Sequence, residues 1–214
     1  MSELVKIVPA VLTDDSKSLT NMIEQAKLFT DFVQIDLMDG AFVPSRSITP
    51  EELVNIKPDI SWEAHIMANE PEKILHFLKD AGASRIIFHY EATDNHEHVI
   101  KTARSLELGV GIALSPSTPG DVLKDLASLI DYVLFMTVNP GYYGAKFIPE
   151  VLSKIKAFRQ QYKNIEIGID GGVKEDNLKL IVNSEVNSVC VGSAIFLSES
   201  PAQSYRNFLD IANS

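Results

Sequence analysis

The stretch FVQIDLMDG, at positions 32–40, decides how the rest of the chain is interpreted. It begins as a short buried strand, because aromatic and β-branched residues favour β-structure. It ends in a turn at Gly40, since glycine adopts backbone angles that other residues resist. Two acids, Asp36 and Asp39, therefore lie at the carboxyl end of an apolar strand. A buried carboxylate must be paired or bound to a metal, so this strand end is a candidate site.

The composition excludes several classes of protein. The chain has 214 residues, of which 45% are apolar and 22% charged, as in ordinary globular proteins. The net charge of -10 disfavours a nucleic-acid partner. No apolar run is long enough for a membrane span, and residues 1–6 lack the apolar core of a signal peptide, so we expect a cytoplasmic protein with no membrane partner. The single cysteine, Cys190, lies in an apolar run and is expected to be buried and unreactive.

Short apolar runs alternate with segments of helical character along the whole chain. Eight runs are predicted as strands, at residues 4–10, 32–36, 60–65, 85–89, 109–114, 132–137, 165–170 and 188–191. Helices are predicted between them, notably at residues 18–30, 71–81, 147–162 and 175–183. Eight strand–helix units in about 210 residues predict a single (β/α)8 TIM barrel, an α/β fold. We expect one domain over residues 1–214; a doubly wound open sheet is the alternative.

Polar residues follow several of these strands, and in a barrel such strand ends gather at one face. Gln34 and Asp36 share one side of their strand because side chains alternate. Asp36, His65 and Asp170 are expected to converge, and two carboxylates with an imidazole suit Zn²⁺, Mn²⁺ or Fe²⁺. Two carboxylates on different walls also suit a proton transfer in which one is the base and the other the acid. Structural roles remain open: His65 as a hydrogen-bonding group and Asp170 as a helix cap.

Three glycine-bearing loops in the last third of the chain indicate a phosphate site. They follow the sixth, seventh and eighth predicted strands at residues 138–146, 170–172 and 191–196. Backbone amides at glycine-rich turns bind phosphate oxygens, and barrels often bind phosphate after their last two strands. The alternative is that these glycines only form turns.

Seven stretches follow one another along nearly the whole chain: DLMDGAFVP at 36–44, AHIM at 64–67, HYEA at 89–92, LSPSTP at 114–119, MTVNPGYYGAKFIPE at 136–150, DGG at 170–172 and GSAIF at 192–196. In these stretches the chain resembles the ribulose-phosphate 3-epimerase family. The resemblance implies a barrel that interconverts D-ribulose 5-phosphate and D-xylulose 5-phosphate through a metal-stabilised enediolate. The implied partner is therefore a small phosphorylated ketose, and the family also leads us to expect a homo-oligomer.

The resemblance assigns roles to individual residues. Asp36 and Asp170 would be the two catalytic acids and also metal ligands, with His65 as a third ligand and substrate-binding residue. Met38, Met67 and Met136 would line the site, although methionines also fill cores. The phosphate and substrate would be held by Gly141, Tyr142, Tyr143, Gly144, Gly171, Gly172, Gly192 and Ser193.

Four positions depart from the family's pattern, one of them being Ser45, which stands where the family usually has asparagine after the proline. Gln34 replaces the usual histidine ligand, and its neutral carbonyl oxygen is a weaker ligand for Zn²⁺, so the metal is expected to bind weakly. Ala10 replaces a substrate-contacting serine, and Ala41 replaces a histidine. Two alternatives follow: an epimerase for another ketose phosphate such as a hexulose 6-phosphate, or a catalytically poor sugar-phosphate sensor. A related barrel decarboxylase is disfavoured because Met38 stands where those enzymes have lysine.

Overall fold

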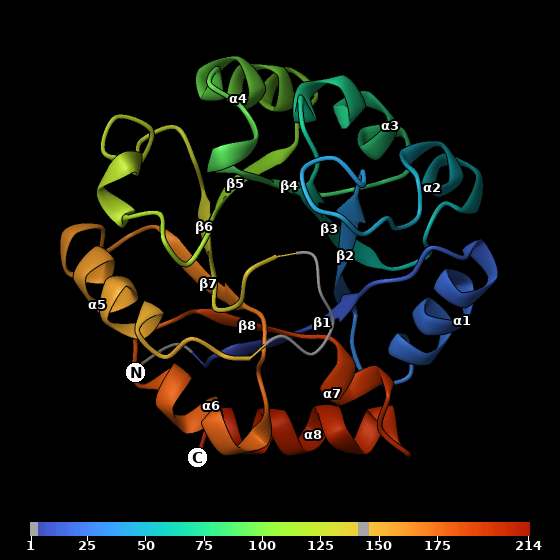
Figure 1. Ribbon diagram of the computed structural model, residues 1–214. Coiled ribbons are helices and arrows are strands. Elements are labelled where there is room, and N and C mark those ends of the chain that lie inside the picture. Colours follow the sequence, from blue (N-terminus) through green and yellow to red (C-terminus); the bar gives the residue numbers. More distant parts are fainter. Residues whose placement is uncertain (1–3, 141–145) are drawn as a thin grey trace.

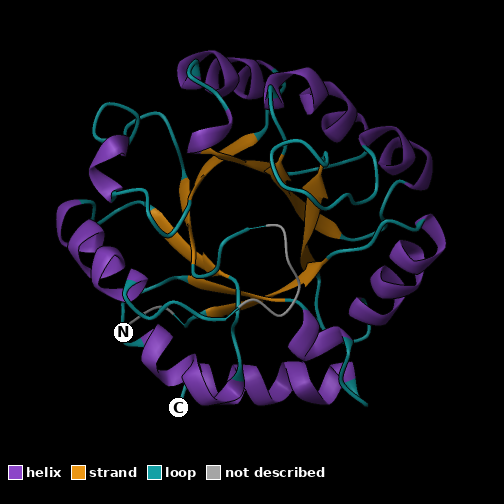
Figure 2. Ribbon diagram, viewed as in Figure 1, coloured by secondary structure: helices purple, strands orange, loops and turns teal. Residues whose placement is uncertain are grey.

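The computed structural model describes residues 4–140 and 146–214, and these form a closed parallel barrel. The strands follow one another around the barrel in sequence order, and β8 pairs with β1 to close it. Helices surround the strands when the molecule is viewed down the barrel (Figure 1, Figure 2). The predicted (β/α)8 TIM barrel is therefore confirmed, and the open sheet is excluded.

The strands lie close to their predicted positions, with ends that differ by no more than two residues. They are β1 (Lys6–Val11), β2 (Phe32–Met38), β3 (Ser61–Met67), β4 (Arg85–His89), β5 (Gly109–Leu114), β6 (Tyr132–Met136), β7 (Glu166–Asp170) and β8 (Ser188–Val191). Each is buried along most of its length, as expected for strands covered by helices on one side and by the barrel interior on the other.

The helices differ more from the prediction than the strands do. They are α1 (Ser16–Ala26), α2 (Pro50–Ile56), α3 (Leu75–Asp80), α4 (His96–Ser105), α5 (Val151–Gln161), α6 (Glu175–Val182), α7 (Ser193–Phe196) and α8 (Pro201–Ala212), with 3₁₀ turns η1 (Pro71–Ile74), η2 (Tyr90–Ala92) and η3 (Gly120–Leu123). Helix α5 begins four residues later than predicted. Ile148 precedes Pro149, and a residue before proline is kept out of the helical region. Between β5 and β6 the chain forms only η3, because Pro119 and Gly120 disfavour a longer helix.

Two apolar layers stabilise the barrel. The larger lies between the strands and the helices, and a smaller cluster that includes Tyr132 and Met136 fills the barrel interior. Gly168 makes room for the phenol of Tyr132, since a Cβ at this glycine would lie 1.6 Å from the Tyr132 Oη. Beside that ring, Arg85 is paired with the fully buried Glu63. The interior is therefore filled at its amino-terminal end, and the carboxyl end is left for a site.

The strand register sets which side chains meet at the carboxyl end. Asp36 on β2 is paired with His65 on β3, and Asp170 on β7 is paired with Cys190 on β8. β1 and β8 lie between the two acid-bearing strands. The termini are tied together where the Val5 amide donates to Asn213 Oδ1. Within residues 4–140 and 146–214, no helix is long and apolar enough to cross a membrane.

Candidate active site

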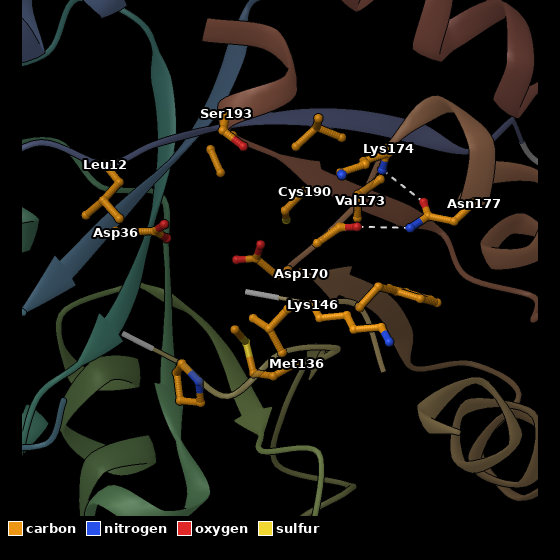
Figure 3. A pocket seen from close by; sticks show the side chains of 18 of the residues that line it. Leu12, Asp36, Met136, Lys146, Asp170, Val173, Lys174, Asn177, Cys190 and Ser193 are labelled. Atoms are coloured by element: carbon orange, nitrogen blue, oxygen red, sulfur yellow. Dashed lines mark hydrogen bonds between the residues drawn. The ribbon is translucent and has the colours of Figure 1, made fainter. Parts of the chain in front are cut away.

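A cavity of about 830 Å³ opens at the carboxyl ends of the strands. It brings together residues that are far apart in the sequence, from β1 through α6 to α7. Figure 3 shows Asp36 and Asp170 approaching the same space from different strands. The lining residues that matter below are Ala10, Asp36, Met38, His65, Met67, Met136, Lys146, Asp170, Gly171, Gly172, Lys174, Asn177, Cys190, Gly192 and Ser193.

Three candidate metal ligands meet in this cavity. Asp36, His65 and Asp170 each offer one ligand atom, and these atoms all lie within 4.8 Å of one another. His65 Nδ1 is 3.0 Å from Asp36 Oδ1 and 3.5 Å from Asp170 Oδ2. Ligand atoms of a tetrahedral ion with bonds of about 2.1 Å are about 3.4 Å apart, so this spacing fits a small divalent cation. Two oxygens and one imidazole nitrogen are also ligands that Zn²⁺, Mn²⁺ and Fe²⁺ accept.

Gln34 lies beside this group and is fully buried. Its Nε2 donates to Asp36 Oδ1 at 2.9 Å and to Asp170 Oδ2 at 2.8 Å. Its Oε1 accepts a hydrogen bond from the Cys190 thiol at 3.1 Å. Gln34, which the family resemblance led us to expect as a weak metal ligand, thus bridges the two acids as a hydrogen-bond donor.

Burial and mutual contact shift the protonation of these groups. Burial raises the pKa of Asp36, assisted by the charge of Asp170 and opposed by the hydrogen bond to His65. Burial alone would lower the pKa of His65, but hydrogen bonds to Asp170 and Asp36 outweigh it and raise that pKa to about 9. A positive charge is therefore strongly favoured between the two carboxylates, and a divalent cation would meet the same demand.

Behind His65 lies a second buried histidine. His65 Nε2 is 3.0 Å from His89 Nε2, and neither side chain reaches solvent. Burial lowers the pKa of His89 to about 4, with a further contribution from the charge of His65. His89 is therefore neutral and accepts the Nε2–H of His65, which leaves His65 Nδ1 facing the carboxylates. Glu91 Oε2 lies 3.4 Å from the other nitrogen of His89.

Asp39 has a different role from its neighbour Asp36. Its Oδ1 accepts from the backbone amides of Ala41 and Phe42, both at 2.8 Å, and its Oδ2 accepts from the amide of Asn69 at 2.9 Å. These bonds join the loop after β2 to the end of β3. Asp39 therefore shapes the rim of the cavity and is not one of the grouped candidate ligands.

The glycine loops after β7 and β8 lie in the same cavity as the acids. Gly171 and Gly172 both have positive φ, at 107° and 65°. Asn177 on α6 fixes this turn: its Nδ2 donates to Gly172 O, and its Oδ1 accepts from the Lys174 amide, both at 2.9 Å (Figure 3). Gly192 lies against β1, because a Cβ there would be 3.1 Å from Ala10 O. These turns place backbone groups about a common opening, as a phosphate site requires.

Several lining residues were not found from the sequence. Lys146 and Lys174 bring two positive charges to the cavity of an acidic protein. Asn177 acts through the turn that it fixes. His89, which lies behind His65 and not on the lining, appeared in the sequence only within the HYEA stretch at 89–92. Isolated lysine and asparagine residues in loops carry no periodic signal, so only the fold reveals where they lie.

The remaining predicted residues have the following places. Met38, Met67 and Met136 line the cavity, as do Gly192 and Ser193. Gly141, Tyr142, Tyr143 and Gly144 lie outside the described residues. Ala10 lines the cavity with its methyl group, whereas Ala41 is exposed on the loop after β2.

Fold and site together define a (β/α)8-barrel enzyme with a group of acids beside a set of glycine turns. A sequence model described as the ribulose-phosphate 3 epimerase family matches residues 6–196. The chain is 35% identical over 204 residues to ribulose-phosphate 3-epimerase of Schizosaccharomyces pombe, covering 92% of this chain and 90% of the relative. It is 33% identical to the enzyme of the same name from Bacillus subtilis, covering 90% of this chain and 93% of the relative. The chain therefore belongs to the ribulose-phosphate 3-epimerase family and is an isomerase.

Solved structures of other activities share the fold. The 3-hexulose-6-phosphate synthase of Salmonella typhimurium aligns with a TM-score of 0.73 at 17% identity, covering 97% of this chain and 98% of that one. Orotidine 5'-monophosphate decarboxylase of Methanocaldococcus jannaschii aligns with a TM-score of 0.66 at 20% identity, covering 98% of this chain and 100% of that one. At these identities the likeness concerns the barrel fold only.

Proposed function

We propose that this chain interconverts D-ribulose 5-phosphate and D-xylulose 5-phosphate by inverting the configuration at C3. The observation that carries the proposal is the pairing of Asp36 and Asp170. They reach one cavity from separate strands, both contact Gln34, and both lie beside His65. Family membership supports the same reaction, since the curated relatives carry this enzyme's name.

Inversion at a carbon requires groups on both of its faces. One aspartate removes the C3 proton, and the other delivers a proton to the opposite face of the resulting planar enediolate. Burial raises the pKa of Asp36 and so makes it a better acceptor for the substrate's proton than an exposed aspartate would be. The two roles exchange when the reaction runs backwards.

The proposed metal ligands are Asp36, His65 and Asp170, with Zn²⁺, Mn²⁺ or Fe²⁺ as the ion. Such an ion would supply positive charge next to the substrate oxygens and thereby make the C3 proton more acidic. His65 lies beside both carboxylates, and in the metal-free protein Gln34 bridges them, so the two acids are already placed close together before substrate binds. Met38 and Met67 cover the reacting region with apolar surface and exclude water from it.

The glycine turns are proposed to hold the phosphate. Gly171, Gly172, Gly192 and Ser193 line the cavity together with the acids, and Lys146 and Lys174 lie on the same lining. Phosphate held at this end fixes the sugar so that C3 is presented to the carboxylates. Tyr142, Tyr143, Gly141 and Gly144 remain proposed phosphate or substrate contacts from the family resemblance.

The alternative substrates are separable by experiment. Ala10 offers no hydroxyl to a pentose phosphate, and this observation favours testing a hexulose 6-phosphate as well. Each ketose phosphate is incubated with the metal-free protein in deuterated water, then with Zn²⁺, Mn²⁺ or Fe²⁺ added, and followed by NMR. We expect deuterium at C3 of ribulose 5-phosphate together with formation of xylulose 5-phosphate. Binding without exchange under every condition would refute the epimerase and leave the sensor.

Two broader proposals accompany the reaction. A cytoplasmic location is supported by a relative from Oryza sativa that is named as a cytoplasmic isoform and is 30% identical over 205 residues. Assembly into a homo-oligomer rests on the family resemblance alone, and sedimentation of the purified chain would test it.

A further inference from the structure

The amide of Gln34 occupies the fourth corner of the candidate metal centre. Its Nε2 is 2.9 Å from Asp36 Oδ1, 2.8 Å from Asp170 Oδ2 and 3.5 Å from His65 Nδ1. The separation from His65 Nδ1 is close to the roughly 3.4 Å expected between ligands of a tetrahedral ion, and the two separations from the carboxylates are shorter, as hydrogen bonds are. An amide N–H, however, is a donor and cannot ligate a cation. In this orientation its hydrogens point at the carboxylate oxygens that a cation would require.

The orientation of this amide follows from its neighbours. Ionised carboxylates only accept hydrogen bonds, so the NH₂ end must face Asp36 and Asp170. The oxygen end faces Cys190, whose thiol donates to it at 3.1 Å. Gln34 and Cys190 are 0% and 1% exposed, so water does not compete for these bonds.

A thiol can serve either end of an amide, because sulfur is both a weak donor and a weak acceptor. Turning the terminal torsion of Gln34 by half a turn would place Oε1 at the fourth corner and Nε2–H against Cys190 Sγ. Terminal amide torsions have two wells of this kind. Gln34 therefore has two orientations in which Cys190 can satisfy its outer end, and they differ in what it presents to the carboxylates.

We propose that Gln34 is a two-position amide that substitutes for the metal ion when the ion is absent and ligates it when it is bound. Cys190 is the hydrogen-bond partner that holds both positions. Cation binding reverses the Gln34–Cys190 bond, so that the thiol changes from donor to acceptor. The inference deepens the proposed function and rests on its assignment of Asp36, His65 and Asp170 as ligands.

The single cysteine provides a direct reporter of this change. Its S–H stretching band lies in an infrared window clear of other protein absorption. Zn²⁺ is titrated into the metal-free protein, and bound zinc is measured alongside the spectrum. We expect the band to move to higher frequency in proportion to bound Zn²⁺, because the thiol loses the oxygen that it donates to. Zinc binding without movement of the band would overturn the proposal, and so would the failure of Zn²⁺, Mn²⁺ and Fe²⁺ all to bind.

Two variants control the assignment of the signal. Cys190→Ser should remove the band. Gln34→Met keeps an unbranched side chain of similar length without the amide, so its band should lie at the higher frequency with and without Zn²⁺. An equal zinc-dependent shift in Gln34→Met would contradict the proposal. The side-chain NH₂ signal of Gln34 in ¹⁵N-glutamine-labelled wild-type protein is a second readout that needs no variant, and it should shift in step with bound zinc.

A histidine at this position provides a further comparison. Gln34→His should bind Zn²⁺ at least roughly tenfold more tightly, because imidazole is the better ligand and no amide donor then competes for the carboxylates. Unchanged affinity would contradict that competition.

The outcomes for the two proposals are distinct. Zinc binding with a shifted S–H band but no exchange at C3 would support the two-position amide and refute the epimerase. Exchange at C3 with a band that zinc leaves unmoved would support the epimerase and refute the two-position amide.

Discussion

Replacing His89 by leucine is expected to weaken metal binding although no proposed metal ligand is substituted. His89 Nε2 lies 3.0 Å from His65 Nε2, and both histidines are fully buried. In the variant, the metal-free protein can drop the Nε2 proton of His65 and keep the Nδ1 proton, which faces Asp36 Oδ1 at 3.0 Å. A bound ion needs the Nδ1 lone pair of His65, so the proton of the neutral imidazole must move to Nε2. In the leucine variant that buried Nε2–H has no acceptor.

The magnitude follows from that unpaired donor. A buried, unsatisfied N–H costs about 1–3 kcal/mol. At about 1.4 kcal/mol per factor of ten, the dissociation constant should rise roughly 5- to 150-fold. This range agrees with the roughly 10- to 100-fold losses seen when partners of metal-bound histidines are removed.

The assay is a competition titration of Zn²⁺ against a chromophoric chelator. His89→Gln is the matched control, because its amide oxygen can accept the Nε2–H of His65, and its affinity should stay within about threefold of the wild type. If His89→Leu binds Zn²⁺ as tightly as the wild type, the argument that His89 sets the tautomer of His65 is refuted.

Three further outcomes are expected. Gly171→Ala should raise the KM for the phosphosugar and lower the free energy of unfolding by about 1–3 kcal/mol. The added Cβ would lie 2.4 Å from Val138 Cγ2, at a residue whose φ is 107°. An unchanged KM would argue against a phosphate contact at this turn. Arg85→Leu should cost about 3–5 kcal/mol in urea unfolding, since it leaves the buried Glu63 carboxylate unpaired, while zinc affinity stays the same; a loss below about 1 kcal/mol would contradict this. In chelator, the contribution of His89 to stability should fall as pH drops from about 6.5, the ordinary pKa of histidine, toward 4, because burial lowers the pKa of His89 to about 4 and the unfolded chain takes up the proton first. His89→Gln should flatten this slope, and an identical slope in the variant would refute the assignment.

Much of the barrel could be predicted because buried parallel strands leave a simple signal. Each strand is a short apolar run, and the alternation of its side chains already placed Gln34 and Asp36 on one side. Parallel strands share an end, so the meeting of Asp36, His65 and Asp170 followed from their positions in the sequence. Helix limits were less predictable, since the late start of α5 depends on Pro149 rather than on apolar periodicity.

The details of the site depended on contacts that no pattern encodes. Asp36 and Asp39 lie three residues apart at the end of the same strand, and nothing in the sequence separates their roles. In the structure Asp39 accepts from backbone amides, whereas Asp36 faces His65. The direction of the Gln34 amide is set by Asp170 and Cys190, which lie more than a hundred residues away along the chain. Such partners become neighbours only when β8 closes the barrel against β1.

The central claim is that Asp36 and Asp170 act on opposite faces of C3. The most direct measurement uses the Asp36→Asn and Asp170→Asn variants. Each variant is incubated separately with C3-deuterated ribulose 5-phosphate and with C3-deuterated xylulose 5-phosphate, and loss of the deuteron is followed by NMR. Asparagine keeps an oxygen that can ligate the ion, so at saturating metal each variant should fail to interconvert the two sugars but still exchange one of them, and the two variants should exchange opposite sugars. Exchange of the same sugar by both variants, or epimerisation that survives either substitution, would contradict the account.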